Sequence, residues 1–191
     1  MAESSKPAED SESPKTSPLY CDPHADVTFV SADGITFKLH SKYFGAVSAG
    51  FSAPETTLVD LPVTSTEPAT VLEFLFQFIH PPCGCEQFHQ PSVMKTPILL
   101  FFDLATAAEK YVVYAAMNVC LTRMYYELYA SHPVKVLNHA ANHGYVELAD
   151  KAAIKTMSLL NPLRDTLGGL TDPKVAVKWV CRRNEWILSS I

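Results

Sequence analysis

A change of hydrophobic period early in the chain is the feature that most constrains its fold. Residues 35–40, "ITFKLH", alternate apolar and polar side chains, which is typical of a half-buried strand. Residues 26–31, "DVTFVS", alternate in the same way, and between the two runs Asp33 and Gly34 tolerate the positive φ angles of a tight turn. The pattern therefore predicts a β-hairpin.

A helical spacing follows this hairpin without an intervening loop. Phe44, Val47 and Phe51 recur at helical intervals, and Ser41 is suited to cap the first turn. We predict a short helix, rich in Gly and Ala and therefore open to close approach by other backbone. His40, at the junction, is predicted to be a hydrogen-bonded structural residue rather than a catalytic one.

The next segments predict a strand, a buried helix and an irregular loop. Residues 57–63, "TLVDLPV", have the pattern of a strand that ends at Pro62. Residues 68–80 begin with a proline suited to a first helical turn and are apolar on nearly every side, which favours a buried helix. Residues 83–97 show no period and are expected to form a loop.

The remainder of the chain is expected to be helical. A break near residues 110–113 separates two helices, and Pro133 and Gly144 are suited to begin and end the next one. A further helix follows, and Asp172 and Pro173 are suited to begin the last. This order predicts the α+β class, with a short β-sheet and its N-terminal hairpin packed against a cluster of α-helices.

The beginning of the chain has the composition of a disordered segment. It consists almost entirely of Ser, Pro, Glu, Lys and Asp, which bury too little surface to offset the entropy of ordering. We predict a disordered leader over residues 1–20, a folded core over residues 21–130 and a C-terminal helical extension over residues 131–191.

Charge and cysteine usage limit the classes of partner and the compartment. A formal net charge of -5 offers no basic field for phosphates, so nucleic acid is not expected as a direct partner. The apolar run at residues 98–102 is far shorter than the ~20 residues that span a bilayer, so no membrane segment is expected. Five cysteines, an odd number, and the absence of a cleavable signal favour an intracellular protein, cytoplasmic or nuclear.

Sequence motifs of catalysis are missing, and one cluster of metal-ligand types stands out. The chain has neither G-x-S-x-G nor G-x-x-x-x-G-K, so we predict a protein that is not an enzyme and has no cofactor. His80, Cys83, Cys85 and His89 lie within ten residues and are ligands of the kind that zinc prefers. Because the C-x-C spacing is tighter than in zinc fingers, we favour a loop with incidental thiols. A zinc site, or a small metal-dependent enzyme built on these residues, is the alternative.

Two further groups of residues suggest chemistry more weakly. His139 and His143 are four residues apart and share a helix face, where they are suited to bind a metal or sense pH, although helix-end histidines are the commoner explanation. Trp179 lies among cationic residues, a combination found in single-strand nucleic-acid binding. A solvated helix face is the favoured interpretation there. The cations are Lys178, Arg182 and Arg183.

From Asp26 onward the sequence resembles a BTB/POZ domain. The resemblance is carried by "DVTFVSADGITFKLHSKYF", by Ser48 with Phe51, by "VDLP", by "TVLEFLFQFIHP" and by "ATAAEKYVVYAAMNVCLTRM". The segment "HPVKVLNHAANHGYVELADKAA" is similar to a branch of that family abundant in mushroom-forming fungi. The resemblance implies that residues 21–130 form the BTB/POZ core.

The resemblance also implies a function in protein–protein interaction. Members of the family act as homodimers that recruit partners, with a sheet edge and the first helix between protomers, and some are substrate adaptors for cullin-type ubiquitin ligases. The candidate residues for the dimer surface are Asp26, Val27, Phe29, Ser41, Phe44, Val47 and Phe51. The candidates for a cullin contact are Ala53 and Glu55. The sequence departs from the family where Ser41 replaces the basic residue of the transcription-regulator branch, and where Ala53 replaces a bulky apolar residue.

Overall fold

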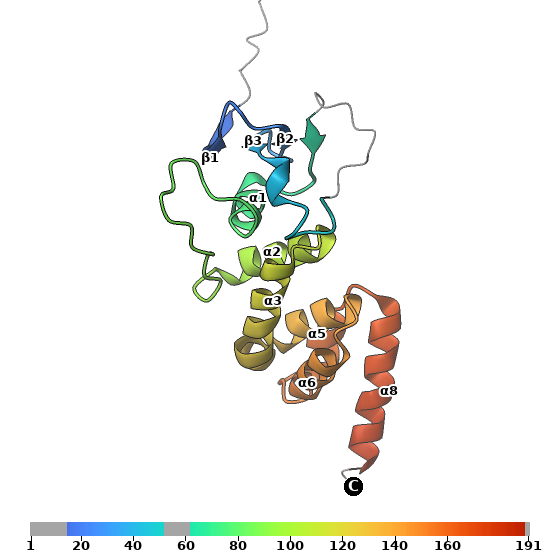
Figure 1. Ribbon diagram of the computed structural model, residues 1–191. Helices are drawn as coiled ribbons and strands as arrows, with labels where there is room; N and C mark the ends of the chain where they lie inside the picture. The colour runs from blue at the N-terminus through green and yellow to red at the C-terminus, as the bar shows by residue number, and fades with distance from the viewer. Residues whose placement is uncertain (1–14, 52–61, 190–191) are drawn as a thin grey trace, which may run out of the picture.

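The chain folds as an α+β structure in which an N-terminal mixed β-sheet precedes a series of helices. Residues 15–51 and 62–189 are described by a computed structural model, with the side chains of Trp186 and Ser189 excepted (Figure 1). The predicted leader up to residue 14 and the cullin candidates Ala53 and Glu55 lie outside the described residues.

The sheet has four strands in the order β1-β3-β2-β4. The strands are β1 (Thr16–Cys21), β2 (Val27–Val30), β3 (Thr36–Leu39) and β4 (Val63–Thr64). Strands β2 and β3 form the predicted antiparallel hairpin, with Phe29 opposite Phe37, and Gly34 in its turn has a φ of 80°. Strands β1 and β4 pair parallel with β3 and β2 respectively.

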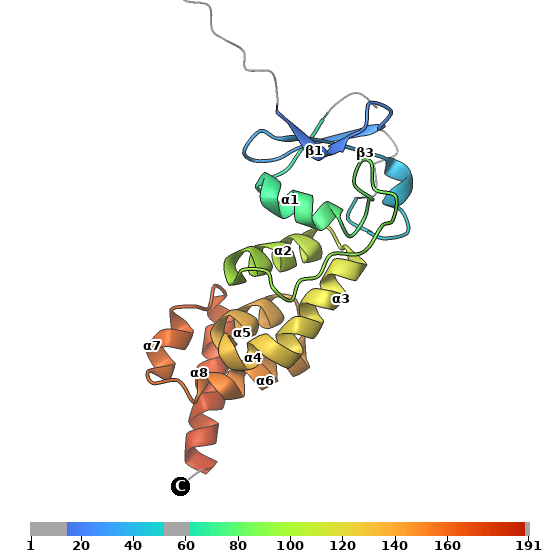
Figure 2. The same cartoon turned by 90° about the vertical axis from the view of Figure 1, so that its left-hand side faces the viewer.

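Helices make up most of the remaining structure. They are η1 (Ser41–Tyr43), α1 (Ala69–Phe76), α2 (Ile98–Lys110), α3 (Tyr114–Arg123), η2 (Met124–Leu128), α4 (Tyr129–Ser131), α5 (Pro133–Asn142), α6 (Val146–Thr156), α7 (Pro162–Leu167) and α8 (Pro173–Ser189). Helix α1 covers one face of the sheet, α2 lies beneath α1, and α3 leads to α5, α6 and α8 at the end of the molecule farthest from the sheet (Figures 1 and 2). The predicted break between two helices is confirmed at residues 111–113, and the predicted start of the terminal helix is confirmed at Pro173.

Two expectations about the N-terminal half are wrong. Strand β1 occupies residues that were expected in the disordered leader, because Tyr20 is fully buried and offsets the cost of ordering them. The helix expected after His40 is only the short 3₁₀ turn η1. Most of the strand expected over residues 57–63 lies outside the described structure, and β4 begins only at Val63, after Pro62.

The segment after η1 is shaped by contacts with the turn between α2 and α3. Ser48 pairs with Val113 in an isolated β-bridge, and its hydroxyl donates a hydrogen bond of 2.5 Å to the carbonyl of Tyr111. A Cβ on Gly50 would overlap that carbonyl oxygen, so only glycine fits. The predicted close approach of backbone is therefore confirmed, although the helix that was to provide it is absent from this described segment.

The centre of the N-terminal core is Phe76 on α1. Its fully buried ring lies 5.4 Å from the rings of both Phe29 and Phe37 and 5.8 Å from that of Tyr20. These edge-on and tilted arrangements are favourable for aromatic pairs and add to the energy of burial. Three strands are thus fastened to one side chain of α1.

Buried Arg123 fastens the irregular loop of residues 83–97 to α3. One nitrogen of its guanidinium donates hydrogen bonds to the carbonyls of Val93 (2.6 Å) and Thr96 (3.1 Å), and the group lies 4.8 Å from the ring centre of Phe101. Glu127 on the next helical turn accepts a further hydrogen bond from Arg123 (3.2 Å). The loop has no regular structure, as predicted, yet its C-terminal end is held by the guanidinium.

Replacing Phe76 with alanine tests the role of this ring. We expect Phe76→Ala to lower the free energy of unfolding by about 3–5 kcal/mol, because it empties the contact shared by three strands. Urea unfolding followed by circular dichroism measures the change. The control is Phe88→Ala in the 83–97 loop, where the side chain is 41% exposed and we expect a change below about 1 kcal/mol. Equal losses in both variants would contradict this role.

Candidate functional site

The predicted dimer surface contains a polar clasp between β2 and η1. The carboxylate of Asp26 accepts hydrogen bonds from the backbone N–H of Ser41 (2.7 Å) and from its hydroxyl (2.5 Å). These bonds favour the ionised carboxylate, so the pKa of Asp26 lies below its usual value, with the hydroxyl as the larger cause. Ser41 was expected to cap a helix; its hydroxyl is instead used to fix the start of η1 to the hairpin, and both residues are exposed.

The apolar candidates for the dimer surface divide between the core and the surface. Phe29 and Phe44 are each only 5% exposed, so their assignment to the dimer surface is corrected: they belong to the core of the single chain. Phe51 is half-buried and stacks on the ring of Tyr111, with ring centres 4.6 Å apart. Val27 and Val47 are half-buried as well. The accessible part of the predicted surface consists of Asp26, Val27, Ser41, Val47 and Phe51.

His40 takes part in a chain of hydrogen bonds at the end of β3. Its Nδ1 lies 2.9 Å from Nε2 of His80, whose Nδ1 lies 2.6 Å from the carbonyl of Pro81. Because a carbonyl only accepts, Nδ1 of His80 carries a proton, and its Nε2 accepts from His40 when His80 is neutral. Burial lowers the pKa of His80 and so favours that neutral form. Nε2 of His40 faces Asp22 at 3.6 Å. His40 is thus hydrogen-bonded to the segment that follows α1.

The four residues of the possible zinc site are not gathered around one point. His80 is buried against His40, whereas the sulfur of Cys83 lies 3.4 Å from the backbone nitrogen of Cys21. The thiol of Cys85 donates to the carbonyl of Gln87 at 2.9 Å. Within residues 15–51 and 62–189, no three His, Cys, Asp or Glu side chains are placed to hold a metal ion together.

The predicted histidine pair lies against a nearly buried carboxylate. Nε2 of His139 is 3.8 Å and Nδ1 of His143 is 4.0 Å from the two oxygens of Glu109, whose side chain is 10% exposed. The hydroxyl of Tyr145 donates a hydrogen bond of 2.6 Å to the same carboxylate. Sequence spacing found the two histidines but not Glu109, because Glu109 belongs to α2 and is distant in the sequence. The cluster joins α2 to the turn between α5 and α6.

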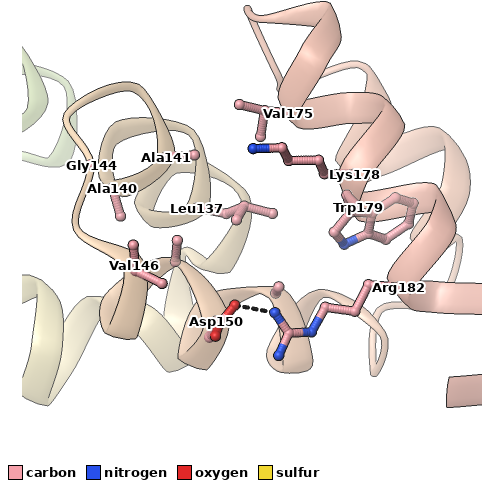
Figure 3. Close-up of a pocket in the computed structure, with 12 residues that line it drawn as sticks. Leu137, Ala140, Ala141, Gly144, Val146, Asp150, Val175, Lys178, Trp179 and Arg182 are labelled. Carbon is pink, nitrogen blue, oxygen red and sulfur yellow. Dashed lines mark hydrogen bonds and ion pairs between the residues drawn. The ribbon is translucent and has the colours of Figure 1, made fainter. Parts of the chain in front are cut away.

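A pocket of about 220 Å³ lies between α5, α6 and α8. Figure 3 shows Leu137 and Ala140 on one wall, with Trp179, Lys178 and Arg182 of α8 opposite them. The walls are largely aliphatic, and a cation from α8 stands at each side of the tryptophan.

The cations of α8 lie at the surface, as the solvated-face interpretation predicts, but the Trp179 among them is buried. Its side chain is 3% exposed and its indole N–H donates to the hydroxyl of Thr156 at 2.8 Å, so the ring is too deeply buried to stack on a nucleic-acid base. Arg182 forms an ion pair with Asp150 on α6. Lys178 is exposed, as expected, and Arg183 is half-buried. Trp179 therefore anchors α8 to the helical end of the molecule.

Comparisons with known proteins add no relative to this picture. The chain matches no protein-family model and no curated protein sequence. Across the described residues, no helix combines the length and the apolar character that a membrane crossing requires.

Burial of His139 makes the stability of the protein dependent on pH. Desolvation, with a smaller contribution from His143, lowers the pKa of His139 to about 4. The unfolded chain protonates this histidine near pH ~6.5, whereas the folded chain keeps it neutral down to about pH 4. The stability that the neutral, buried His139 contributes is therefore complete above pH ~6.5 and is lost as the pH falls towards 4. Between pH ~7.5 and ~5 we expect it to remove about 2 kcal/mol from the free energy of unfolding.

The variant His139→Phe isolates this effect. Its unfolding free energy should fall by about 2 kcal/mol less than that of the wild type between pH ~7.5 and ~5. Urea titrations at both pH values measure the difference, and the exposed His89→Phe provides the control. The same pH dependence in the His139→Phe and wild-type proteins would exclude His139 as the cause.

Proposed function

We propose that this chain is a non-catalytic protein-interaction module of the BTB/POZ type, which forms homodimers and recruits a partner protein. The proposal rests on the order of elements: a hairpin runs directly into a short helical turn, a strand returns beside the hairpin, and a buried helix precedes a loop and a pair of helices. That order agrees with what the sequence resemblance implies for the family.

The arrangement at the N-terminal end supports a surface for self-association. Asp26 and Ser41 are exposed, and the half-buried Val47 and Phe51 lie on the segment that follows them. Strand β4 is an outer strand of the sheet, with Val63 42% exposed. A protein can use such a combination of sheet edge and apolar side chains to pair with a second chain. We propose that this surface, formed by the accessible side chains of residues 41–51, the start of β2 and the outer strand β4, is the contact between protomers.

The mass of the protein in solution tests the proposal. We expect light scattering on a sizing column to give at least the mass of a dimer at concentrations of ~10 µM and above, typical of a standard-size protein interface. Ala46 is exposed between Phe44 and Val47, so Ala46→Glu places a charge on the proposed contact without removing a hydrogen bond.

We expect Ala46→Glu to weaken dimerisation at least roughly tenfold, because a carboxylate is costly to desolvate in an interface. The matched control is Ala130→Glu, which adds the same charge at an exposed position of α4. A wild-type protein that is monomeric up to ~100 µM would refute the homodimer, and dimerisation unaffected by Ala46→Glu would place the contact elsewhere.

A further inference from the structure

Helix α8 has two apolar faces, and only one of them is used within the described chain. The first carries Trp179 and packs on α5 and α6. The second carries the apolar Val177, Cys181 and Leu188 with the polar Asn184 among them, spaced by four, three and four residues, so these side chains form one stripe along the helix. Val177 is 64% and Leu188 is 74% exposed, and the other two residues are exposed as well.

The two edges of this stripe differ in character. Val180 and Ile187 extend it on one side with further apolar surface. Lys178 and Glu185, of opposite charge and both exposed, lie along the other side, seven residues apart. When a second copy of the helix runs in the opposite direction, the Lys178 position of each helix lies near the Glu185 of the other, so the opposite charges match.

We propose that the α8 stripe binds the α8 helix of a second copy of this chain in an antiparallel pair. The stripe spacing fixes the register, because apolar layers form where Val177 faces Leu188 of the second copy, and Cys181 faces its Asn184 between them. In that register the Lys178 position lies across the seam from the Glu185 of the other helix, so the exposed Lys178 side chain, which lines the pocket beside Trp179 in the single chain (Figure 3), turns to the seam in the pair. Val180 and Ile187 meet in the same manner on the opposite edge.

Charge disfavours the parallel alternative. In a parallel pair, Cys181 and Asn184 would each face their own counterpart, and Glu185 would lie beside Val180 of the second copy. Neither Lys178 nor Glu185 would then meet an opposite charge. In the antiparallel pair, Lys178 of each helix meets Glu185 of the other, so the two-fold axis gives two such contacts.

The position of α8 in the molecule leaves room for this pairing. The helix lies at the end of the molecule opposite the sheet, and its C-terminal half extends beyond α5 and α6 (Figures 1 and 2). Trp179 and Arg182 hold the other side of the helix against the body of the protein, so the stripe points away from it. The contact is separate from the proposed N-terminal surface and does not depend on it.

Charge exchange tests the pairing, in the Ala46→Glu background so that association through the N-terminal surface is suppressed. Sedimentation velocity over a concentration series measures the dissociation constant. We expect Glu185→Lys, and separately Lys178→Glu, to weaken association roughly tenfold, and the double exchange Lys178→Glu/Glu185→Lys to restore it. Glu86→Lys, an exposed charge reversal in the 83–97 loop, is the control and should change nothing.

Disulfide trapping tests the register and direction. In a Cys21→Ser/Cys83→Ser/Cys85→Ser background, mild oxidation of the Asn184→Cys variant should give a covalent dimer, because the thiol introduced on one helix then faces Cys181 of the other. Without Asn184→Cys, two Cys181 residues are out of register by about 4.5 Å along the helix axis, and we expect little crosslinking.

Three results would overturn the proposal. The first is efficient crosslinking through Cys181 alone, which would indicate a parallel pair. The second is a pair of single charge reversals without effect, and the third is a double exchange that fails to restore association. The two proposals can fail separately. If Ala46→Glu has no effect on association but the α8 charge reversals do, the proposed N-terminal dimer is wrong and the α8 pair stands.

Discussion

The aromatic contacts of Phe76 are the interaction on which the N-terminal half depends. An isolated four-stranded sheet with strands as short as β4 would not be stable by itself. The ring of Phe76 gives β1, β2 and β3 one shared partner on α1, so that the strands gain burial together rather than in pairs. The same cluster includes Phe51, 6.1 Å away, which brings the segment after η1 to the sheet.

Three consecutive residues at the end of α2 connect the two halves of the molecule. Lys110 donates a hydrogen bond of 2.7 Å to Glu67, just before α1. Tyr111 stacks on Phe51 and donates to Glu67 at 2.5 Å, and Glu109 faces the opposite way to accept from Tyr145. The hydrogen bonds that Glu67 accepts, from Lys110 and Tyr111 among others, outweigh its burial and lower its pKa to about 2, so this carboxylate is ionised throughout the physiological range. A displacement of the α2 terminus would therefore alter the contacts of both the N-terminal sheet region and the C-terminal helices.

The sequence pattern predicted the strands and helices whose apolar residues recur with a regular period. It missed the elements that are held in place by contacts between residues far apart in the sequence. The hairpin was predictable because alternation and the turn at Gly34 agree. The helical spacing of Phe44 and Phe51 predicted a helix that residues 41–51 do not form. Both rings instead pack against the ring of Phe29, with ring centres 6.0 and 5.4 Å away, from a segment whose only helical turn is η1. Strand β1 was hidden by a leader-like composition. The histidine pair at the end of α5 was visible as a spacing, but its carboxylate partner Glu109 belongs to a distant helix and had no local signal.

The two proposed contacts lie at opposite ends of the molecule, and this placement has a geometrical consequence for assembly. A protein with one two-fold contact forms a closed pair, whereas a protein with two such contacts at its two ends adds copies alternately head-to-head and tail-to-tail. The length of such a row is set by concentration and by the weaker of the two contacts. Acting at either end, a competing partner would then work as a chain terminator, and its stoichiometry would control the size of the assembly.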